Sequence, residues 1–294
     1  MRLKTIFFSF TLILFGGGFA YAQEKAETMA RSAFVREYNN SFLLQVLIVR
    51  NFMTLEGEDG GGTASFEPDT PNKLGFGFAY KSIAFAYSFD VFKEGHGVGT
   101  RSDDFQFYIF PKHFAIDAFW QRYKGFRAKS GDGKFEKIFD DMIFQRASLC
   151  IEYVFNDKLS LAAAFSQTEK QLKSAGSFLL GGGFYYNELN FEGIEENVQI
   201  GPLVGYAYTF VFLKDFYFTG VIAGGINLTS KADDDENLIN YVILPKFALG
   251  YSRDLWSFSI FYIFHNDVVS SSKDYEFAAQ SGQFAFSLAV RFKI

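Results

Sequence analysis

Side chains of alternating size between Lys73 and Phe92 constrain the fold of this chain more than any other feature. The large ones, on either side of Lys81-Ser82, are Leu74, Phe76, Phe78 and Tyr80, then Ile83, Phe85, Tyr87, Phe89 and Val91. The small ones are Gly75, Gly77 and Ala79, then Ala84, Ala86, Ser88 and Asp90. A period of two predicts two β-strands joined by a tight turn. A soluble sheet would set a strongly polar face against the apolar one, and this sequence lacks such a face.

The same alternation recurs along most of the chain. The further runs are residues 42–48, 105–109, 114–120, 147–155, 159–166, 206–212, 256–264 and 284–292. In the run LSLAAAFS (159–166), Ser160, Ala162 and Ala164 fall on the small face, and we expect a strand there.

Short and long connections alternate between these runs. The short ones are residues 81–82, 111–113, 156–158, 213–215 and 252–255. The long polar ones are residues 53–72, 93–102, 124–141, 230–237 and 266–280. Short periplasmic turns and long outer loops are typical of an all-β, transmembrane, antiparallel up-and-down β-barrel of the outer membrane. A soluble secreted β-sandwich is the structural alternative.

The strand number is expected to be even if both chain ends lie on one side of the membrane. About thirteen strand-like runs can be read from the alternation. The doubtful region is residues 167–199, where Gly181-Gly182-Gly183 weakens a strand. We favour twelve strands, with this region giving one bent or bulged crossing, and keep fourteen as the alternative.

The N-terminus reads as an export signal. Arg2 and Lys4 precede an apolar run that ends in Ala20-Tyr21-Ala22, which predicts a signal peptide over 1–22. A short periplasmic segment over 23–40 and an outer-membrane barrel over 41–294 complete the predicted organisation. The single cysteine, Cys150, excludes an internal disulfide, and the net charge of −5 gives no nucleic-acid footprint. The chain has 40 Phe and 16 Tyr, more aromatic residues than a soluble core of this size would bury.

The barrel hypothesis assigns each side chain to one of two environments. The residues predicted to face lipid are Phe76, Phe78, Phe85, Tyr87, Phe89, Phe258, Phe284 and Phe286. The polar residues predicted to face the lumen are Asp90, Asp117, Arg146, Glu152 and Arg291, which either line a water path or form structural pairs. The small inward set is Gly75, Gly77, Ala79, Ala84, Ala86, Ser160, Ala162, Ala164, Ala285, Ser287 and Ala289. Such small residues leave space in a barrel of this size, and we expect residues 23–40 or a long loop to occlude it partly.

No residue is assigned a catalytic, cofactor-binding or metal-binding role. His96 and His113 fall in connections, and His265, near Ser270–Ser272, is read as a solvated strand-end histidine rather than a lipid hydrolase residue. The acidic run Asp233–Glu236 lacks the spacing of a calcium loop. The stretch GEDGGG (57–62), which begins Gly57-Glu58-Asp59-Gly60, reads as a flexible loop tip, and Cys150 as a small lumen-facing filler.

Several segments together resemble a known family. They are residues 68–89, 103–126, 166–186 and 201–212, which include the distinctive stretches QRYKGF and KSAGSFLLGG. These segments resemble the exported barrel-like proteins of Bacteroidota known as domain of unknown function 4421. The resemblance covers most of the mature chain and implies an outer-membrane-type barrel, with no activity, ligand or catalytic residue attached.

We therefore expect a non-enzymatic outer-membrane barrel in contact with lipid, acting as a narrow or partly occluded channel or transporter for small solutes. The first alternative is a structural or assembly scaffold that binds a partner through its loops or N-terminal segment. A lipid-modifying barrel enzyme is the second alternative. No cofactor is expected.

Overall fold

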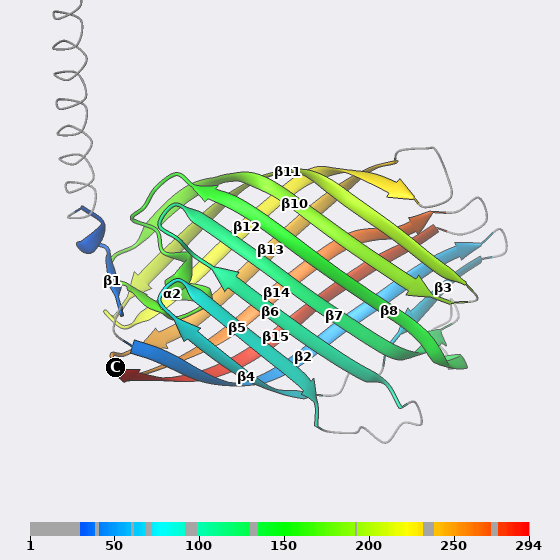
Figure 1. Ribbon diagram of the computed structural model, residues 1–294, viewed down its shortest axis with the longest axis horizontal. Coiled ribbons are helices and arrows are strands. Elements are labelled where there is room, and N and C mark those ends of the chain that lie inside the picture. The colour runs from blue at the N-terminus through cyan, green and yellow to red at the C-terminus, as the bar shows by residue number, and fades with distance from the viewer. Residues whose placement is uncertain are drawn as a thin grey trace, which may run out of the picture.

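A closed antiparallel β-barrel makes up most of the molecule (Figure 1). The computed structural model describes residues 30–38, 41–59, 62–68, 72–91, 99–129, 135–191, 193–231, 238–271 and 276–293. The predicted signal peptide, residues 1–22, lies outside the described residues. Within those residues no helix is long and apolar enough to cross a bilayer.

The elements follow one another as a long meander with one interruption. They are β1 (Val35–Glu37), β2 (Ser41–Asp59), β3 (Gly62–Glu67), β4 (Lys73–Tyr80), β5 (Ile83–Asp90), β6 (Arg101–Ile109), β7 (Phe114–Lys129), β8 (Phe135–Val154), α2 (Leu161–Phe165), β9 (Glu169–Gln171), β10 (Ala175–Asn190), β11 (Ile194–Phe212), β12 (Phe216–Lys231), β13 (Leu238–Ser252), β14 (Trp256–Ser271) and β15 (Glu276–Lys293).

Twelve strands form the wall of the barrel. The main sheet has 13 strands, and without the short β3 the remaining twelve pair as a ring, β2-β4-β5-β6-β7-β8 and then β10 to β15. The ring closes where β15 pairs with β2, from Lys293↔Ser41 to Glu276↔Glu58. This ring confirms the predicted fold class and the strand number of twelve, and it rules out the β-sandwich, whose sheets stay open.

The run at 159–166 is not a strand, so that prediction was wrong. Leu161–Phe165 forms the short helix α2, and Ser160 caps it by accepting a hydrogen bond from the Ala163 backbone N–H at 2.9 Å. All five residues of the helix are buried, whereas a wall strand would expose every second one. Since this run is not a crossing, the count of about thirteen falls to the even number that a barrel requires.

The glycine triplet does not interrupt its strand either. Gly181–Gly183 lies within β10, paired on one side with β8 and on the other with β11. A Cβ atom on Gly181 would lie 1.9 Å from the Ile151 carbonyl oxygen, so glycine is needed for this close approach of two backbones.

The two ends of the barrel differ. The turn end carries the short connections 81–82, 110–113, 213–215 and 253–255, together with the start of β2 and the end of β15 (Figure 1). The opposite end is called the loop end. Here β3 pairs with both β2 and β7 beyond the ends of β4, β5 and β6, so the ring narrows from twelve strands to ten (12 − 3 + 1).

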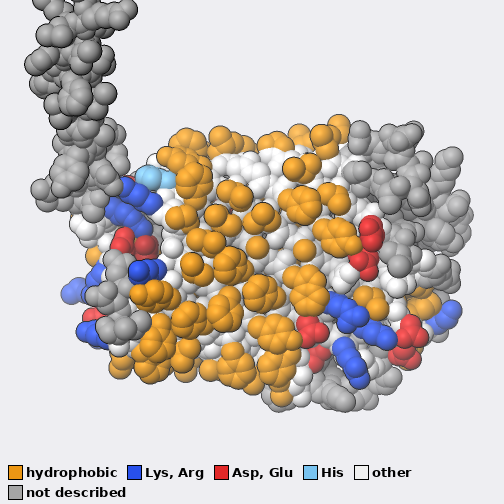
Figure 2. Space-filling view, viewed as in Figure 1, with side chains coloured by type: hydrophobic (Ala, Val, Ile, Leu, Met, Phe, Trp, Pro, Cys, Tyr) orange, Lys and Arg blue, Asp and Glu red, His pale blue; other side chains and the backbone are white. Residues whose placement is uncertain are grey.

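Large apolar side chains cover the outer surface between charged ends (Figure 2). Of the eight residues predicted to face lipid, Phe76, Phe85, Tyr87, Phe284 and Phe286 are exposed. The remaining three are half-buried because they pack against neighbouring rings on the same outer surface. The contacts are Phe78 with Phe85, Phe89 with Tyr87, and Phe258 with Phe286.

A pair of arginine substitutions on one strand tests this outer surface. Phe286 and Gln280 are both exposed on the outer face of β15, and Gln280 lies six residues nearer the loop end. Phe286→Arg should destabilise the barrel folded in vesicles by about 2–4 kcal/mol, because it places a charge near the bilayer midplane. Gln280→Arg should destabilise it by only about 0–1 kcal/mol, because its charge lies nearer the interface. Heat-modifiable gel mobility during urea titration measures both. Equal costs at the two depths would contradict a membrane-spanning band.

Candidate functional site: an occluded lumen

The connection between β8 and β10, residues 155–174, folds into the barrel at the turn end. Its helix α2 inserts Phe165 between Tyr108 and Phe261. The Phe165 ring centroid lies 6.5 Å from that of Tyr108 and 6.3 Å from that of Phe261. The Tyr217 hydroxyl donates a hydrogen bond to the Ala164 carbonyl oxygen at 3.3 Å. Residues 156–158 form the turn that the sequence suggested, closed by a hydrogen bond from the Leu159 N–H to the Asn156 carbonyl oxygen at 3.1 Å. This turn does not join two wall strands directly, because it leads into the lumen-filling segment.

Arg291 holds this connection against the wall. Its guanidinium donates to the Gln167 carbonyl oxygen at 2.8 Å and to the Arg253 carbonyl oxygen at 2.6 Å. The Gln167 side chain in turn bonds the hydroxyls of Ser257 and Ser259 on β14. Gln167 has φ 58°, a left-handed conformation that is unusual for a non-glycine residue, and these contacts stabilise it.

Strand β9 continues the connection and pairs with β1, apart from the barrel wall. The register runs from Val35↔Gln171 to Glu37↔Glu169. The described part of the 23–40 segment thus backs the connection at the turn end, and the lumen is filled by residues 155–174. The expected occlusion is present, and among the described residues the connection 155–174 supplies it at this end. Residues 23–29 and 39–40 and the middles of several long loops lie outside the described residues.

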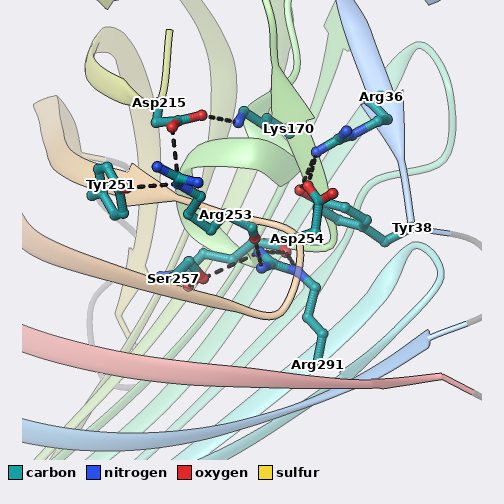
Figure 3. A network of polar contacts seen from close by, with 10 residues as sticks. Arg36, Tyr38, Lys170, Asp215, Tyr251, Arg253, Asp254, Ser257 and Arg291 are labelled. Atoms are coloured by element: carbon teal, nitrogen blue, oxygen red, sulfur yellow. Dashed lines mark hydrogen bonds and ion pairs between the residues drawn. The ribbon is translucent and has the colours of Figure 1, made fainter. Parts of the chain in front are cut away.

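Charged side chains link the paired strands β1 and β9 to the barrel wall at the turn end (Figure 3). Asp215 pairs with Lys170 of β9 and, at 3.0 Å, with Arg253. Arg36 of β1 pairs with Asp254, in the turn between β13 and β14. The hydrogen bond from Lys170, together with the nearby positive charges, holds the pKa of the Asp215 carboxyl below its ordinary value.

A second set of charges lies deep in the lumen, near the loop end. The Lys73 ammonium, whose side chain has no exposed surface, pairs with Asp104 Oδ2 at 2.7 Å. Asn51 donates to the same oxygen at 2.5 Å and to the Tyr123 hydroxyl at 2.8 Å. Asp90 is half-buried beside them and accepts two hydrogen bonds from Ser102, at 2.6 and 2.8 Å.

A third set crosses the middle of the barrel. Lys246 of β13 pairs with Asp117 of β7, and Gln106 also donates to this carboxylate. Both charged side chains are about nine-tenths buried. A carboxylate and an ammonium in a low-dielectric interior depend on each other, since each alone would carry the full cost of desolvation.

The five polar residues predicted for the lumen are placed on its inner side. Asp117, Arg146, Glu152 and Arg291 are buried, and Asp90 is half-buried. Arg146 donates to the Ser281 hydroxyl at 2.5 Å and lies over the Phe119 ring, 4.9 Å from its centroid. Four of the five have described partners that hold them in place, and the fifth, Glu152, is buried with no described hydrogen-bond partner for its Oε1 atom.

The other candidate residues fall in several environments. His265 is buried beside Phe119, with ring centroids 4.7 Å apart, so the reading of a solvated strand-end histidine was wrong. Cys150 is buried and 3.4 Å from the Tyr185 hydroxyl. Gly57 belongs to the paired strand β2, so the predicted flexible tip does not begin there.

Other candidates cannot be placed in full. His96, Asp233–Glu236 and Gly60 lie outside the described residues, as does Ser272. His113 is half-buried in its turn, with Nδ1 3.2 Å from the Val154 carbonyl oxygen. Among the described residues, no group of three or more His, Cys, Asp or Glu side chains could hold a metal ion.

Sequence reasoning assigned no role to Lys73, Asp104 or Lys246. Asp104 alternates with the large residues Phe105 and Phe107, and Lys246 shares the inward parity of Ala248 and Gly250. Alternation alone could therefore have found these two residues. Their partners could not be found in this way, because β13 meets β7 across the barrel and not along the sheet.

An apolar cluster closes the loop end of the lumen. Its buried members are Met53, Leu55, Phe66, Tyr123, Phe126, Met142, Phe144, Leu189 and Ala279. Phe66 comes from β3, so the strand that narrows the ring also contributes to the filling. Between this cluster and Phe165 lies a cavity of about 60 Å³.

A closed, twelve-stranded antiparallel ring with an apolar outer band defines a transmembrane β-barrel of the outer-membrane type. The chain belongs to the family described as Domain of unknown function (DUF4421), which it matches over residues 30–292. No curated protein matches the chain.

Three solved structures that the chain resembles are distant from it in sequence. The translocator domain of autotransporter NalP from Neisseria meningitidis has a TM-score of 0.46 and 10% identity, covering 94% of this chain and 97% of that one. OmpT of Vibrio cholerae has a TM-score of 0.32 and 9% identity, covering 88% and 100%. The KdgM porin has a TM-score of 0.28 and 10% identity, covering 82% and 99%.

The buried pair Lys246–Asp117 gives a test of the interior. Lys246→Met should lower the free energy of unfolding by about 3–5 kcal/mol, because it leaves a buried carboxylate without its counter-ion. Adding Asp117→Leu should recover part of that loss, since the unpaired carboxylate of Asp117 is then also removed, although Glu152 stays buried without Lys246 nearby. Urea unfolding in lipid vesicles measures both. A double variant no more stable than Lys246→Met would contradict the pairing.

The charge network at the turn end gives a pH test. Because the pKa of Asp215 is lowered from the ordinary 3.8, its contacts stabilise the folded state fully above about pH 4 and are lost as pH falls through the lowered value. Amides of β9 should exchange more slowly in the wild type than in Asp215→Asn at pH 5–7, after correction for intrinsic rates. The two proteins should begin to converge only below about pH 4, and should coincide once the pH is below the lowered pKa of Asp215. A difference that grows in acid would contradict the sign.

Proposed function

We propose that the protein is a non-enzymatic, narrow channel of the outer membrane for small solutes, described here in a closed state, in which residues 155–174 act as the gate. One observation carries the proposal: the ring of wall strands is complete without this connection. The connection fills the lumen, yet its only strand pairs with β1 in a separate sheet. It can therefore leave the lumen without breaking a hydrogen bond of the wall strands' ladder.

The contacts of the connection also support a gate. Several are polar bonds to wall residues, such as those from Tyr217, Ser257 and Arg291, and a hydrated lumen could replace them. In barrels of this kind the short turns face the periplasm, so a gate at the turn end would lie on the periplasmic side. The apolar cluster around Phe144 would form a second closure on the outer side.

A structural or assembly scaffold is the second candidate. Arg36, Arg253 and Asp254 keep 43%, 60% and 74% of their side chains exposed at the turn end, where a periplasmic partner could bind them. Charged groups of this kind favour association rate and specificity more than affinity. A scaffold does not require a lumen that opens.

Conductance in planar bilayers separates the two functions. The wild type should show rare, small openings, and replacement of residues 161–171 by a Gly-Ser linker should raise the frequency of openings, because the gate is removed. Leu213→Ser, in an exposed turn at the same end, is the matched control and should behave as the wild type. Heat-modifiable mobility verifies that each variant is folded.

The outer closure requires one further variant. Phe66→Ala with Phe144→Ala, added to the linker variant, opens the apolar cluster at the loop end. If folded barrels of this combined variant still pass no current, the channel proposal fails and the scaffold remains.

A further inference from the structure

The cavity in the middle of the lumen contains polar atoms without partners. Phe165 borders it toward the turn end, and Asp104 and Gln121 border it toward the loop end. Its volume of about 60 Å³ suffices for about four water molecules, at 10–15 Å³ each. Much of its remaining lining is apolar, including Leu47, Val49, Ala84 and Ile263.

Three of the side chains that line this cavity each have a buried atom that forms no hydrogen bond with any described residue. These atoms are Gln45 Nε2, Asp104 Oδ1 and Gln121 Oε1. The three residues keep 7%, 6% and 9% of their surface exposed, so bulk water does not satisfy them. Buried polar atoms normally have partners, and three orphans around one cavity indicate a bound species.

Two unpartnered oxygens beside the cavity favour a cation. Asp104 Oδ2 accepts hydrogen bonds from Lys73, Asn51 and Ser88, and Oδ1 has no described partner. Gln121, which carries the second unpartnered oxygen, lies directly opposite Asp104 in the register of β6 and β7. Because Lys73 and Arg146 balance the charges of Asp90 and Asp104, a cation would be held by these oxygen ligands and not by an excess of negative charge.

We propose that the cavity binds a small monovalent cation, held by Asp104 Oδ1 and Gln121 Oε1. The Gln45 amide can supply a third oxygen, because rotation about its last torsion exchanges oxygen and nitrogen. Calcium requires six to eight oxygen ligands, more than this cavity offers. A second part of the inference is that monovalent cations are the solutes of the channel. This part rests on the function proposed above.

Rubidium provides a direct test on the full-length protein. Crystals soaked in RbCl should show an anomalous difference peak in the cavity, between Asp104 and Gln121. Gln121→Leu removes one ligand without touching a described ion pair, and should raise the RbCl concentration for half-occupancy by about tenfold. Gln283→Leu is the matched control, because Gln283 lines the same cavity but has no unpartnered buried atom. It should leave the peak unchanged.

Each outcome decides the site independently of conductance. Density for water alone, or a rubidium peak equally affected by Gln121→Leu and Gln283→Leu, overturns the inference. Rubidium in the cavity of a barrel that never conducts retains the site and rejects the channel. Two results in the linker variant together reject the cavity as the selectivity filter of a working channel. The first is a current with no preference for K⁺ over Cl⁻, and the second is an unchanged current after addition of Asp104→Asn.

Discussion

Hydrogen bonding between β15 and β2 is the constraint on which the rest of the structure depends. In hydrocarbon an unpaired backbone N–H or C=O costs several kcal/mol, so a sheet can cross a membrane only if it has no edge. Closure of the ring fixes which residue of each pair points outward. Aromatic side chains then cover the outside, and Gly, Ala, Ser and the charged groups are left for a narrow interior.

That interior is filled in three different ways along its length. At the turn end the connection 155–174 enters as a helix and a short strand, and Phe165 closes the lumen. At the loop end β3 narrows the ring and an apolar cluster fills it. Between them lie the ion pairs and the cavity, where charge is compensated by specific partners and not by solvent.

Side-chain size and backbone closure together explain how a filled lumen is compatible with the proposed gate. Small wall residues such as Ala285 leave room that Phe165 and its neighbours occupy. Because the filling segment contributes nothing to the wall's hydrogen-bond ladder, opening and closing would leave the membrane-spanning structure unchanged. The two main ligands of the proposed cation site, Asp104 and Gln121, lie on the wall strands β6 and β7 and not on the gate.

Alternation in the sequence determined the barrel class and the orientation of the faces, because a period of two translates directly into inside and outside. The number of twelve strands required in addition the rule that such barrels have an even number. Alternation also indicated which polar residues turn inward. It misread residues 159–166, since alternating small and apolar residues suit a buried helix as well as a strand, and only the surroundings distinguish them. Partners across the lumen, such as Lys246 and Asp117, and the cavity beside Asp104, were decided by the tertiary structure, because they depend on the radius of the closed ring.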